Sequence, residues 1–116
     1  MFIYSYIFLA VLNLIVKMVK ELNQENFNEF IKDKAVIDFY ADWCMPCQMM
    51  KPVFEELSKE ININFGKVNT EDNIELARKF NIMSIPCLIV FKNGKEAHRI
   101  LGYRDKEALK QEIDKL

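Results

Sequence analysis

The 116-residue sequence has little glycine, proline or cysteine, with three residues of each. Three cysteines are too few for the disulfide framework that stabilises small, core-poor domains. Because glycine and proline are scarce, each of them marks a specific place in the fold. The formal net charge is only −1, which gives no indication of binding to nucleic acid or to an anionic membrane.

The composition is otherwise that of a globular domain. Hydrophobic residues make up 51 % and charged residues 28 % of the chain, and its length suffices for one domain with a buried core. No internal repeat, linker or low-complexity stretch interrupts it. One folded domain is therefore expected, and we place it at residues 18–116.

Residues 1–17 form a hydrophobic N-terminal extension in which Lys17 is the first charged residue. As a helix, its apolar run would reach roughly 24 Å, against roughly 30 Å for the hydrocarbon core of a bilayer. The basic start and small-residue cleavage site of a secretory signal are missing. Three interpretations stay open: a dispensable extension from an upstream start, a membrane anchor or export segment, and a segment docked on the domain.

Hydrophobic periodicity predicts alternating strands and helices after the extension. Strands are expected at residues 19–22, 35–40, 64–68, 87–91 and 96–101. Helices are expected at residues 24–32, 46–60, 70–80 and 105–116. Asn93-Gly94 predicts a two-residue hairpin turn between the last two strands. The order βαβαβαββα predicts an α/β fold, a central mixed sheet with helices on both faces.

Each predicted helix has one apolar face. Asn23 is the expected N-cap of the first helix and Asn69 or Thr70 that of the third, while Pro52 is expected to kink the second. The residues expected to face the core are Phe27, Phe30, Ile31, Met49, Val53, Phe54, Leu57, Ile74, Leu76, Ala77, Phe80, Leu109, Ile113 and Leu116.

The segment Trp43-Cys44-Met45-Pro46-Cys47 contains two cysteines three residues apart. Such a pair either exchanges electrons as a dithiol or supplies half of a metal site. Here it follows a predicted buried strand and opens a predicted helix, a setting typical of a redox motif. The free N–H groups and positive dipole of a helix start stabilise a thiolate, so Cys44 is the expected nucleophile. Cys47, one turn inside, is expected to be more buried and to act as the resolving thiol.

The metal alternative is a zinc site made of Cys44, Cys47, Cys87 and His98. Structural zinc sites usually draw their ligands from two close pairs, and this sequence has only one such pair. We therefore expect neither a metal site nor a cofactor, and interpret His98 as an exposed or cross-strand residue of the hairpin.

From residue 18 onward, the sequence resembles the thioredoxin family. The features that carry this resemblance follow one another in the family's order: Val36-Ile37-Asp38-Phe39-Tyr40-Ala41-Asp42, Trp43-Cys44-Met45-Pro46-Cys47, Lys51-Pro52, Lys67, Ser84-Ile85-Pro86 and Phe91-Lys92-Asn93-Gly94-Lys95. The resemblance implies the thioredoxin fold and a protein disulfide oxidoreductase. It would reduce protein disulfides by dithiol–disulfide exchange through Cys44 and Cys47.

The resemblance also implies a proton acceptor beside the cysteines. Asp38 lies at the end of an apolar strand, where desolvation favours the neutral carboxyl and suits it to accept the Cys47 proton. Lys67 would be the charge partner of Asp38. The alternatives are a surface acid on an edge strand for Asp38 and a solvent-facing side chain for Lys67.

Substrate contacts are implied on both sides of the cysteines. Ile85 and Pro86, with the proline in the cis form, would face the dithiol and offer backbone to an extended substrate peptide. The other expected substrate-binding residues are Trp43, Met45 and Pro46. Trp43 is expected to pack beside Cys44 and shield it.

Two positions depart from the family's usual pattern. Met45-Pro46 replaces the familiar Gly-Pro between the cysteines, which adds an adaptable apolar side chain at the mouth of the site. Cys87 stands where thioredoxins usually carry threonine. It is either a small buried residue of a core strand or a third thiol close enough to exchange with the dithiol.

The resemblance implies thioredoxin reductase and disulfide-containing proteins as partners of a cytoplasmic monomer. Membrane contact is expected only if residues 1–17 act as an anchor. The alternative function is an exported or membrane-anchored thiol oxidase or isomerase of the same fold. A redox potential of about −270 mV would match thioredoxin, and one of about −120 mV a strong oxidant.

Overall fold

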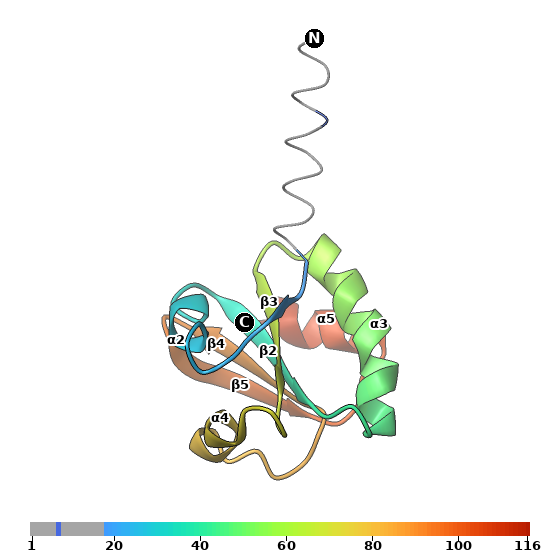
Figure 1. Ribbon diagram of the computed structural model, residues 1–116. Coiled ribbons are helices and arrows are strands. Elements are labelled where there is room, and N and C mark those ends of the chain that lie inside the picture. The colour runs from blue at the N-terminus through green and yellow to red at the C-terminus, as the bar shows by residue number, and fades with distance from the viewer. Residues whose placement is uncertain (1–6, 8–17) are drawn as a thin grey trace.

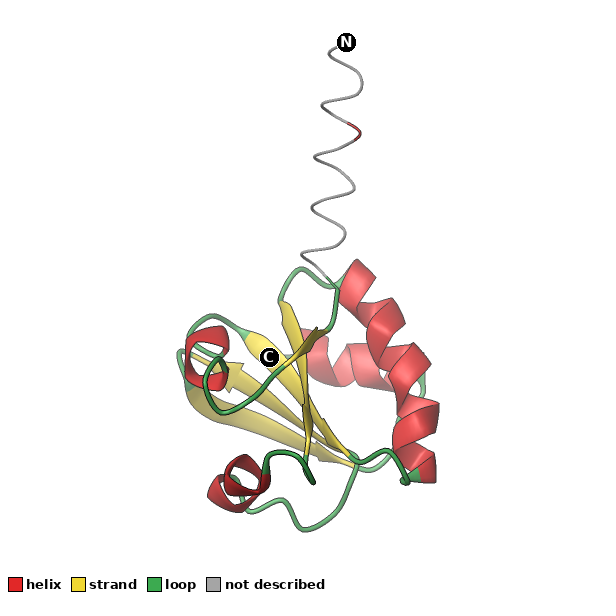
Figure 2. Ribbon diagram, in the orientation of Figure 1, coloured by secondary structure: helices red, strands yellow, loops and turns green. Residues whose placement is uncertain are grey.

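A computed structural model describes Ile7 and residues 18–116, so the predicted extension at residues 1–17 lies outside the described residues apart from Ile7. The strands are β1 (Lys20–Glu21), β2 (Ala35–Tyr40), β3 (Asn64–Asn69), β4 (Cys87–Lys92) and β5 (Lys95–Leu101). The helices are α2 (Phe27–Phe30), α3 (Met45–Glu60), α4 (Ile74–Lys79) and α5 (Lys106–Asp114). The predicted order βαβαβαββα is confirmed (Figures 1 and 2).

The strands form a five-stranded sheet in the order β1-β3-β2-β4-β5. β3 pairs in parallel with both β1 and β2, because helices connect these strands. β4 runs antiparallel to β2 and to β5. Helices α3 and α5 cover one face of the sheet, and α2 and α4 cover the other (Figure 1). The prediction of a mixed sheet between two helical layers is therefore confirmed.

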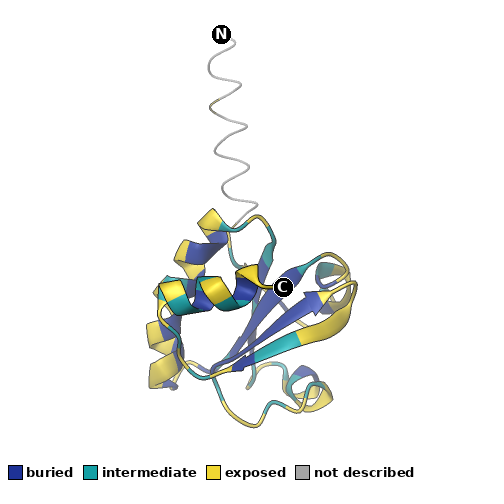
Figure 3. Cartoon of the chain, turned by 180° about the vertical axis from the view of Figure 1, so that it is seen from behind, coloured by how far each residue is buried: buried dark blue, intermediate teal, exposed yellow. Residues whose placement is uncertain are grey.

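Alternate residues of the central strand β2 belong to different cores, because successive side chains of a strand point to opposite faces. Ile37 and Phe39 pack in the cluster under α2 and α4. Val36 packs with Met50 of α3 and Leu109 of α5 on the other face. The inner surfaces of the sheet and helices are buried while the outward helix faces are exposed (Figure 3). Strand parity thus assigns each β2 side chain to one of the two layers.

The Asn93-Gly94 turn confirms the hairpin prediction. β4 ends at Lys92 and β5 begins at Lys95. Both turn residues have positive φ, 53° for Asn93 and 79° for Gly94, as a two-residue turn that follows the twist of its strands requires. Among the residues that the structure describes, no helix is long and apolar enough to cross a membrane.

The helices before β2 and after β3 are shorter than predicted. Asn23 does not cap α2, since its Oδ1 accepts the N–H groups of Glu25 and Asn26 at 2.9 and 3.1 Å and closes a turn instead. Neither Asn69 nor Thr70 caps α4, whose N-cap is Asn73. Asparagine side chains often satisfy backbone groups in this way, in competition with a helix.

Two side chains predicted to be buried lie at the surface. Met49 is 52 % and Ile74 53 % exposed. Helix α3 turns Met50, Phe54 and Leu57 inward, and Met49 precedes this stripe by one residue, about 100° round the helix. α3 continues through Pro52, and the kink predicted there stays a prediction.

Gly66 of β3 lies under Leu22, which follows β1, and under Phe30 of α2. A Cβ atom there would come within 2.7 Å of Leu22 Cδ1, 2.8 Å of Phe30 Cε1 and 3.1 Å of Ile37 Cδ1. We therefore expect Gly66→Val to lower the free energy of unfolding by about 2–3 kcal/mol through overpacking, measured by urea denaturation.

Ala97→Val serves as the control, because it introduces the same valine side chain at an exposed position of β5. It should change stability by less than about 0.5 kcal/mol. An unchanged urea midpoint for Gly66→Val would contradict this close approach of Leu22 and Phe30 to β3.

Candidate functional site

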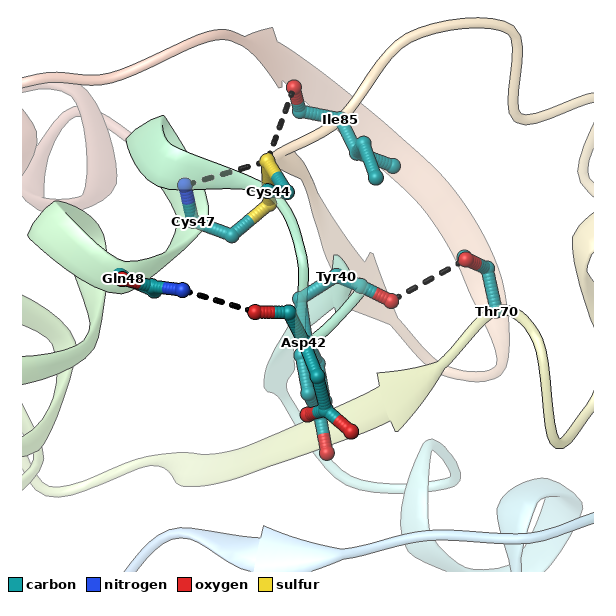
Figure 4. The surroundings of a disulfide bond; sticks show 7 residues. All are labelled: Tyr40, Asp42, Cys44, Cys47, Gln48, Thr70 and Ile85. Carbon is teal, nitrogen blue, oxygen red and sulfur yellow. Dashed lines mark hydrogen bonds between the residues drawn. A yellow bond between two sulfur atoms is a disulfide. The ribbon is translucent and has the colours of Figure 1, made fainter.

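The two cysteines lie where β2 leads into α3. Cys44 is the N-cap of α3 and Cys47 lies in its first turn, with Cα atoms 5.2 Å apart. Their sulfur atoms form a disulfide bond (Figure 4). The Cys47 N–H points at Cys44 Sγ, with a nitrogen-to-sulfur distance of 3.3 Å. A backbone donor at a helix start stabilises negative charge on that sulfur once the bond is reduced.

Burial does not separate the two cysteines as predicted. Each is only 4 % exposed in the disulfide form, so the expectation that Cys47 is the more buried is wrong. The partly buried side chains of Tyr40 and Ile85 pack against the pair. The expectation that Trp43 shields Cys44 is also wrong, because this side chain is 70 % exposed.

The peptide bond between Ile85 and Pro86 is cis, as predicted. It places the Ile85 carbonyl oxygen 3.7 Å from Cys44 Sγ (Figure 4). The Pro86 carbonyl accepts a hydrogen bond from Gly102 N–H at 2.9 Å, which ties the segment to the end of β5. The cysteines therefore face a backbone segment that is anchored on its far side.

Two side chains that the sequence had not assigned to the site secure the backbone around the disulfide (Figure 4). Gln48 Nε2 of α3 donates to the Asp42 carbonyl at 2.8 Å. Thr70 donates to the Tyr40 carbonyl from both N and Oγ1, at 2.9 and 3.1 Å. The Thr70 contact joins segments 30 residues apart, so no local pattern could have predicted it.

Asp38 is buried in the central strand, with only 5 % of its surface exposed. Its Oδ1 atom has no hydrogen-bond partner among the described residues. Burial raises the pKa of this carboxyl from 3.8 to about 7, against the opposing positive charge of Lys67 and with a smaller raising effect from Glu21. Asp38 therefore titrates near neutral pH, and the alternative of a surface acid is wrong.

A pocket of about 160 Å³ joins Asp38 to Cys47. It has room for several water molecules. Its walls come from β2, the loop after it, α3 and β3. The lining residues are Asp38, Tyr40, Ala41, Asp42, Cys47, Gln48, Lys51 and Lys67. The structure thus brings together the carboxyl and the thiol between which a proton transfer was predicted.

Lys67 lies directly across from Asp38 in the parallel pairing of β2 and β3. Its Nζ atom is 5.6 Å from the centre of the Tyr40 ring, and it does not bond to Asp38 Oδ1, whose partner is missing among residues 18–116. Lys67 is half-buried. Its charge lowers the pKa of Asp38, while its role as the charge partner stays a prediction.

Cys87 lies in the core on the opposite side of the sheet from Asp38. It packs with Phe39 in the cluster under α2 and α4, and it is fully buried and unbonded. Burial is the main reason that the pKa of its thiol is raised, which disfavours the reactive thiolate. These observations favour the interpretation of Cys87 as a core residue over that of an exchanging third thiol.

The four candidate zinc ligands do not converge. Cys44 and Cys47 are joined to each other, and His98 Nε2 on β5 lies 3.4 Å from Glu112 Oε2. Among the described residues, no group of three or more histidine, cysteine or acidic side chains is arranged to hold a metal ion.

Exposed apolar side chains surround the disulfide. Trp43 and Met45 are 70 % and 65 % exposed, and Pro46 is exposed beside them. Met49, one helical turn after Met45, extends this surface. The sequence pattern had assigned Met49 to the core. Its i+4 spacing from Met45 was the signal that both methionines lie on the same exposed face of the helix.

Comparison with protein families matches residues 18–115 to the family described as Thioredoxin. A thioredoxin of Chlamydia caviae is 48 % identical over 94 residues, which cover 79 % of this chain and 92 % of that protein. A thioredoxin of Chlamydia pneumoniae is 43 % identical over 100 residues, covering 84 % and 98 %. Among solved structures, that of Plasmodium falciparum thioredoxin is similar with a TM-score of 0.79 at 38 % identity, covering 84 % of this chain and 98 % of that one.

The buried Asp38 predicts a pH-dependent stability difference. The native state binds its proton more tightly than the unfolded chain, so stability falls as the pH rises from about 4 to about 7. Asp38→Asn has no carboxyl to ionise at this position, so it does not undergo this fall in stability. Urea denaturation across the pH range should show the variant equal to the native protein near pH 3, and more stable by a few kcal/mol above pH 7, as a rough figure.

Asp33→Asn is the matched control, because Asp33 is exposed just before the same strand. Its stability should differ from the native protein by less than about 0.5 kcal/mol. A constant difference between Asp38→Asn and the native protein at all pH values would contradict the raised pKa of Asp38.

Proposed function

The chain belongs to the thioredoxin family, and from that premise we propose how its residues reduce a protein disulfide. It is a protein disulfide oxidoreductase, and Cys44 and Cys47 are its redox-active pair. The observation that carries the proposal is the Cys44–Cys47 disulfide at the start of α3, beside cis Pro86 and above the pocket of Asp38.

The reaction begins from the reduced pair. The Cys44 thiolate attacks one sulfur of the substrate disulfide, and the other substrate sulfur leaves as a thiolate. A mixed disulfide now joins Cys44 to the substrate. The helix start and the Cys47 N–H, 3.3 Å from Cys44 Sγ, support this assignment because they favour negative charge on Cys44 rather than on Cys47.

Asp38 accepts the proton of Cys47 in the second step. The resulting Cys47 thiolate attacks Cys44 Sγ, and the second substrate sulfur leaves as a thiolate. The substrate gains two electrons and the pair is left as the disulfide seen in the structure. A carboxyl with a pKa of about 7 suits a proton acceptor at neutral pH. The pocket that Asp38 shares with Cys47 supports this role.

Substrates dock on the apolar surface around the disulfide. Trp43, Met45 and Pro46 contact the substrate from one side, and their exposure supports this role. Ile85 and Pro86 contact it from the other. Because Pro86 is itself buried, this segment acts through its backbone, which pairs with an extended peptide.

Disulfide-containing proteins are the substrates that family membership implies. We assign recharging of the oxidised pair to a thioredoxin reductase, and place the monomeric protein in the cytoplasm, where thiols are kept reduced. The alternative of an exported thiol oxidase or isomerase is not favoured by the thioredoxin relatives.

Serine variants separate the roles of the two cysteines. Cys44→Ser should abolish the reduction of insulin disulfides, because no nucleophile remains. Cys47→Ser should accumulate a covalent mixed disulfide with insulin, because the second attack is lost. Turbidity measures the first result, and non-reducing electrophoresis with mass spectrometry measures the second.

Cys87→Ala is the control for a cysteine outside the reaction, and it should keep the native turnover. Turnover by Cys47→Ser at the native rate would contradict the two-thiol mechanism.

Asp38→Asn should slow the resolution of the mixed disulfide without unfolding the domain. At pH 7 the expected loss is roughly a hundredfold, which is the low end of general base catalysis. The loss should shrink toward pH 8.5, where an ordinary thiol begins to ionise unaided. Stopped-flow measurement of a single turnover, with Asp33→Asn as control, tests this role. Equal rates for Asp38→Asn and the native protein across the pH range would remove Asp38 from the mechanism.

A further inference from the structure

Three ionisable groups stand side by side on the face of the sheet that α3 covers. Lys67 of β3 pairs in register with Glu21 of β1 on one side and with Asp38 of β2 on the other. Neighbouring strands lie about 4.8 Å apart and residues in register point to the same face. The Lys67 residue therefore stands on this face between two acidic residues, a buried one and an exposed one.

Tyr40 connects the exposed carboxylate to this row. It follows Asp38 by two residues and so lies on the same face of β2. Its hydroxyl group donates a hydrogen bond of 2.6 Å to Glu21 Oε1. The bond spans β3, and Lys67 Nζ lies 5.6 Å from the centre of the Tyr40 ring. Glu21, although exposed, is thereby held beside Lys67 instead of moving freely in solvent.

The hydroxyl group of Tyr40 keeps its proton near neutral pH and so continues to donate its hydrogen bond to Glu21. Burial and the hydrogen bond to Glu21 both raise the pKa of Tyr40 well above its usual value. The contact is a charge-assisted hydrogen bond, which is shorter and stronger than a neutral one.

The remaining polar groups around Asp38 come from other elements. Cys47 and Lys51 of α3 and Asp42 of the loop after β2 line the same pocket. Lys51 and Asp42 are exposed, and among the described residues no side-chain hydrogen bond like that of Tyr40 to Glu21 holds their charged groups in place. Solvent therefore screens their charges. Cys87 of β4 lies on the opposite face of the sheet and is buried. Lys67 and Glu21 are thus the charges arranged to act on Asp38.

We propose that Glu21, held in place by Tyr40, is a positioning residue of the disulfide reaction. Its carboxylate competes with Asp38 for the Lys67 ammonium and sets the pH range in which Asp38 accepts the Cys47 proton. The inference deepens the proposed function and depends on it only for the kinetic consequence. It also explains why Lys67 lies against Tyr40 while Asp38 Oδ1 has no partner among the described residues.

Glu21→Gln in the full-length chain tests the proposal directly. The variant removes the negative charge of Glu21, so that the positive charge of Lys67 acts on Asp38 without competition from Glu21. The carboxyl carbon of Asp38, followed by NMR in ¹³C-aspartate-labelled oxidised protein, should titrate about half a pH unit lower than in the native protein. Asp38→Asn assigns the signal. Glu25→Gln is the matched control, since it removes an equal exposed charge four residues along the chain, and should shift the midpoint by less than about 0.1 unit.

Tyr40→Phe tests the anchoring hydrogen bond, because it keeps the ring beside Lys67 and removes only the hydroxyl group. The Asp38 midpoint should fall in the same direction by a smaller amount, as Glu21 moves into solvent. The double variant should shift it no further than Glu21→Gln alone. Equal midpoints for Glu21→Gln and Glu25→Gln would overturn the proposal, and an unmoved midpoint in Tyr40→Phe would overturn the part assigned to Tyr40.

The kinetic readout separates this inference from the proposed function. The pH profile of mixed-disulfide resolution in Glu21→Gln should move to lower pH by the same amount as the NMR midpoint. A shifted NMR midpoint with an unmoved profile would support the action of Glu21 on Asp38 and overturn the role of Asp38 as the proton acceptor.

Discussion

The position of β2 between β3 and β4 is the constraint on which the rest of the site depends. A strand paired on both sides and covered on both faces is buried along nearly all of its length, and only Tyr40 at its end is partly exposed. Asp38 is part of that strand and lies on the face toward α3. Its carboxyl therefore keeps its proton to near neutral pH. The end of β2 also sets where α3 begins, and with it the place of Cys44.

Two opposing effects meet at Asp38. Burial without a hydrogen-bond partner favours the protonated carboxyl, and the Lys67 charge favours the carboxylate. Burial is the larger effect. Lys67 also pairs in register with Glu21 and lies over the ring of Tyr40. The fold loses stability as the pH rises from about 4 to about 7 as a result, and the reaction gains a base that is half-ionised at neutral pH. Conflict between stability and local chemistry is expected at a functional site.

Strand and helix geometry also decides which sulfur-containing side chains are available to a substrate. Cys87 belongs to the layer opposite Asp38 because it pairs with Phe39, the next residue along β2. Met49 lies outside the inward stripe of α3 and joins Met45 and Trp43 at the surface. The apolar area around the disulfide is therefore larger than the Trp43–Cys47 segment by itself suggests. Methionine suits such a surface, since its flexible side chain adapts to different partners.

Local patterns in the sequence were sufficient for the order of the elements, the hairpin at Asn93-Gly94, the redox pair and the burial of Asp38. Each depends on residues close together in the chain, such as an apolar run or a turn dipeptide. Tertiary structure decided the equal burial of Cys44 and Cys47, the exposure of Trp43 and Met49, and the register that places Lys67 between Asp38 and Glu21. These features depend on side chains from distant segments, whose distances and relative orientation only strand register and helix packing determine.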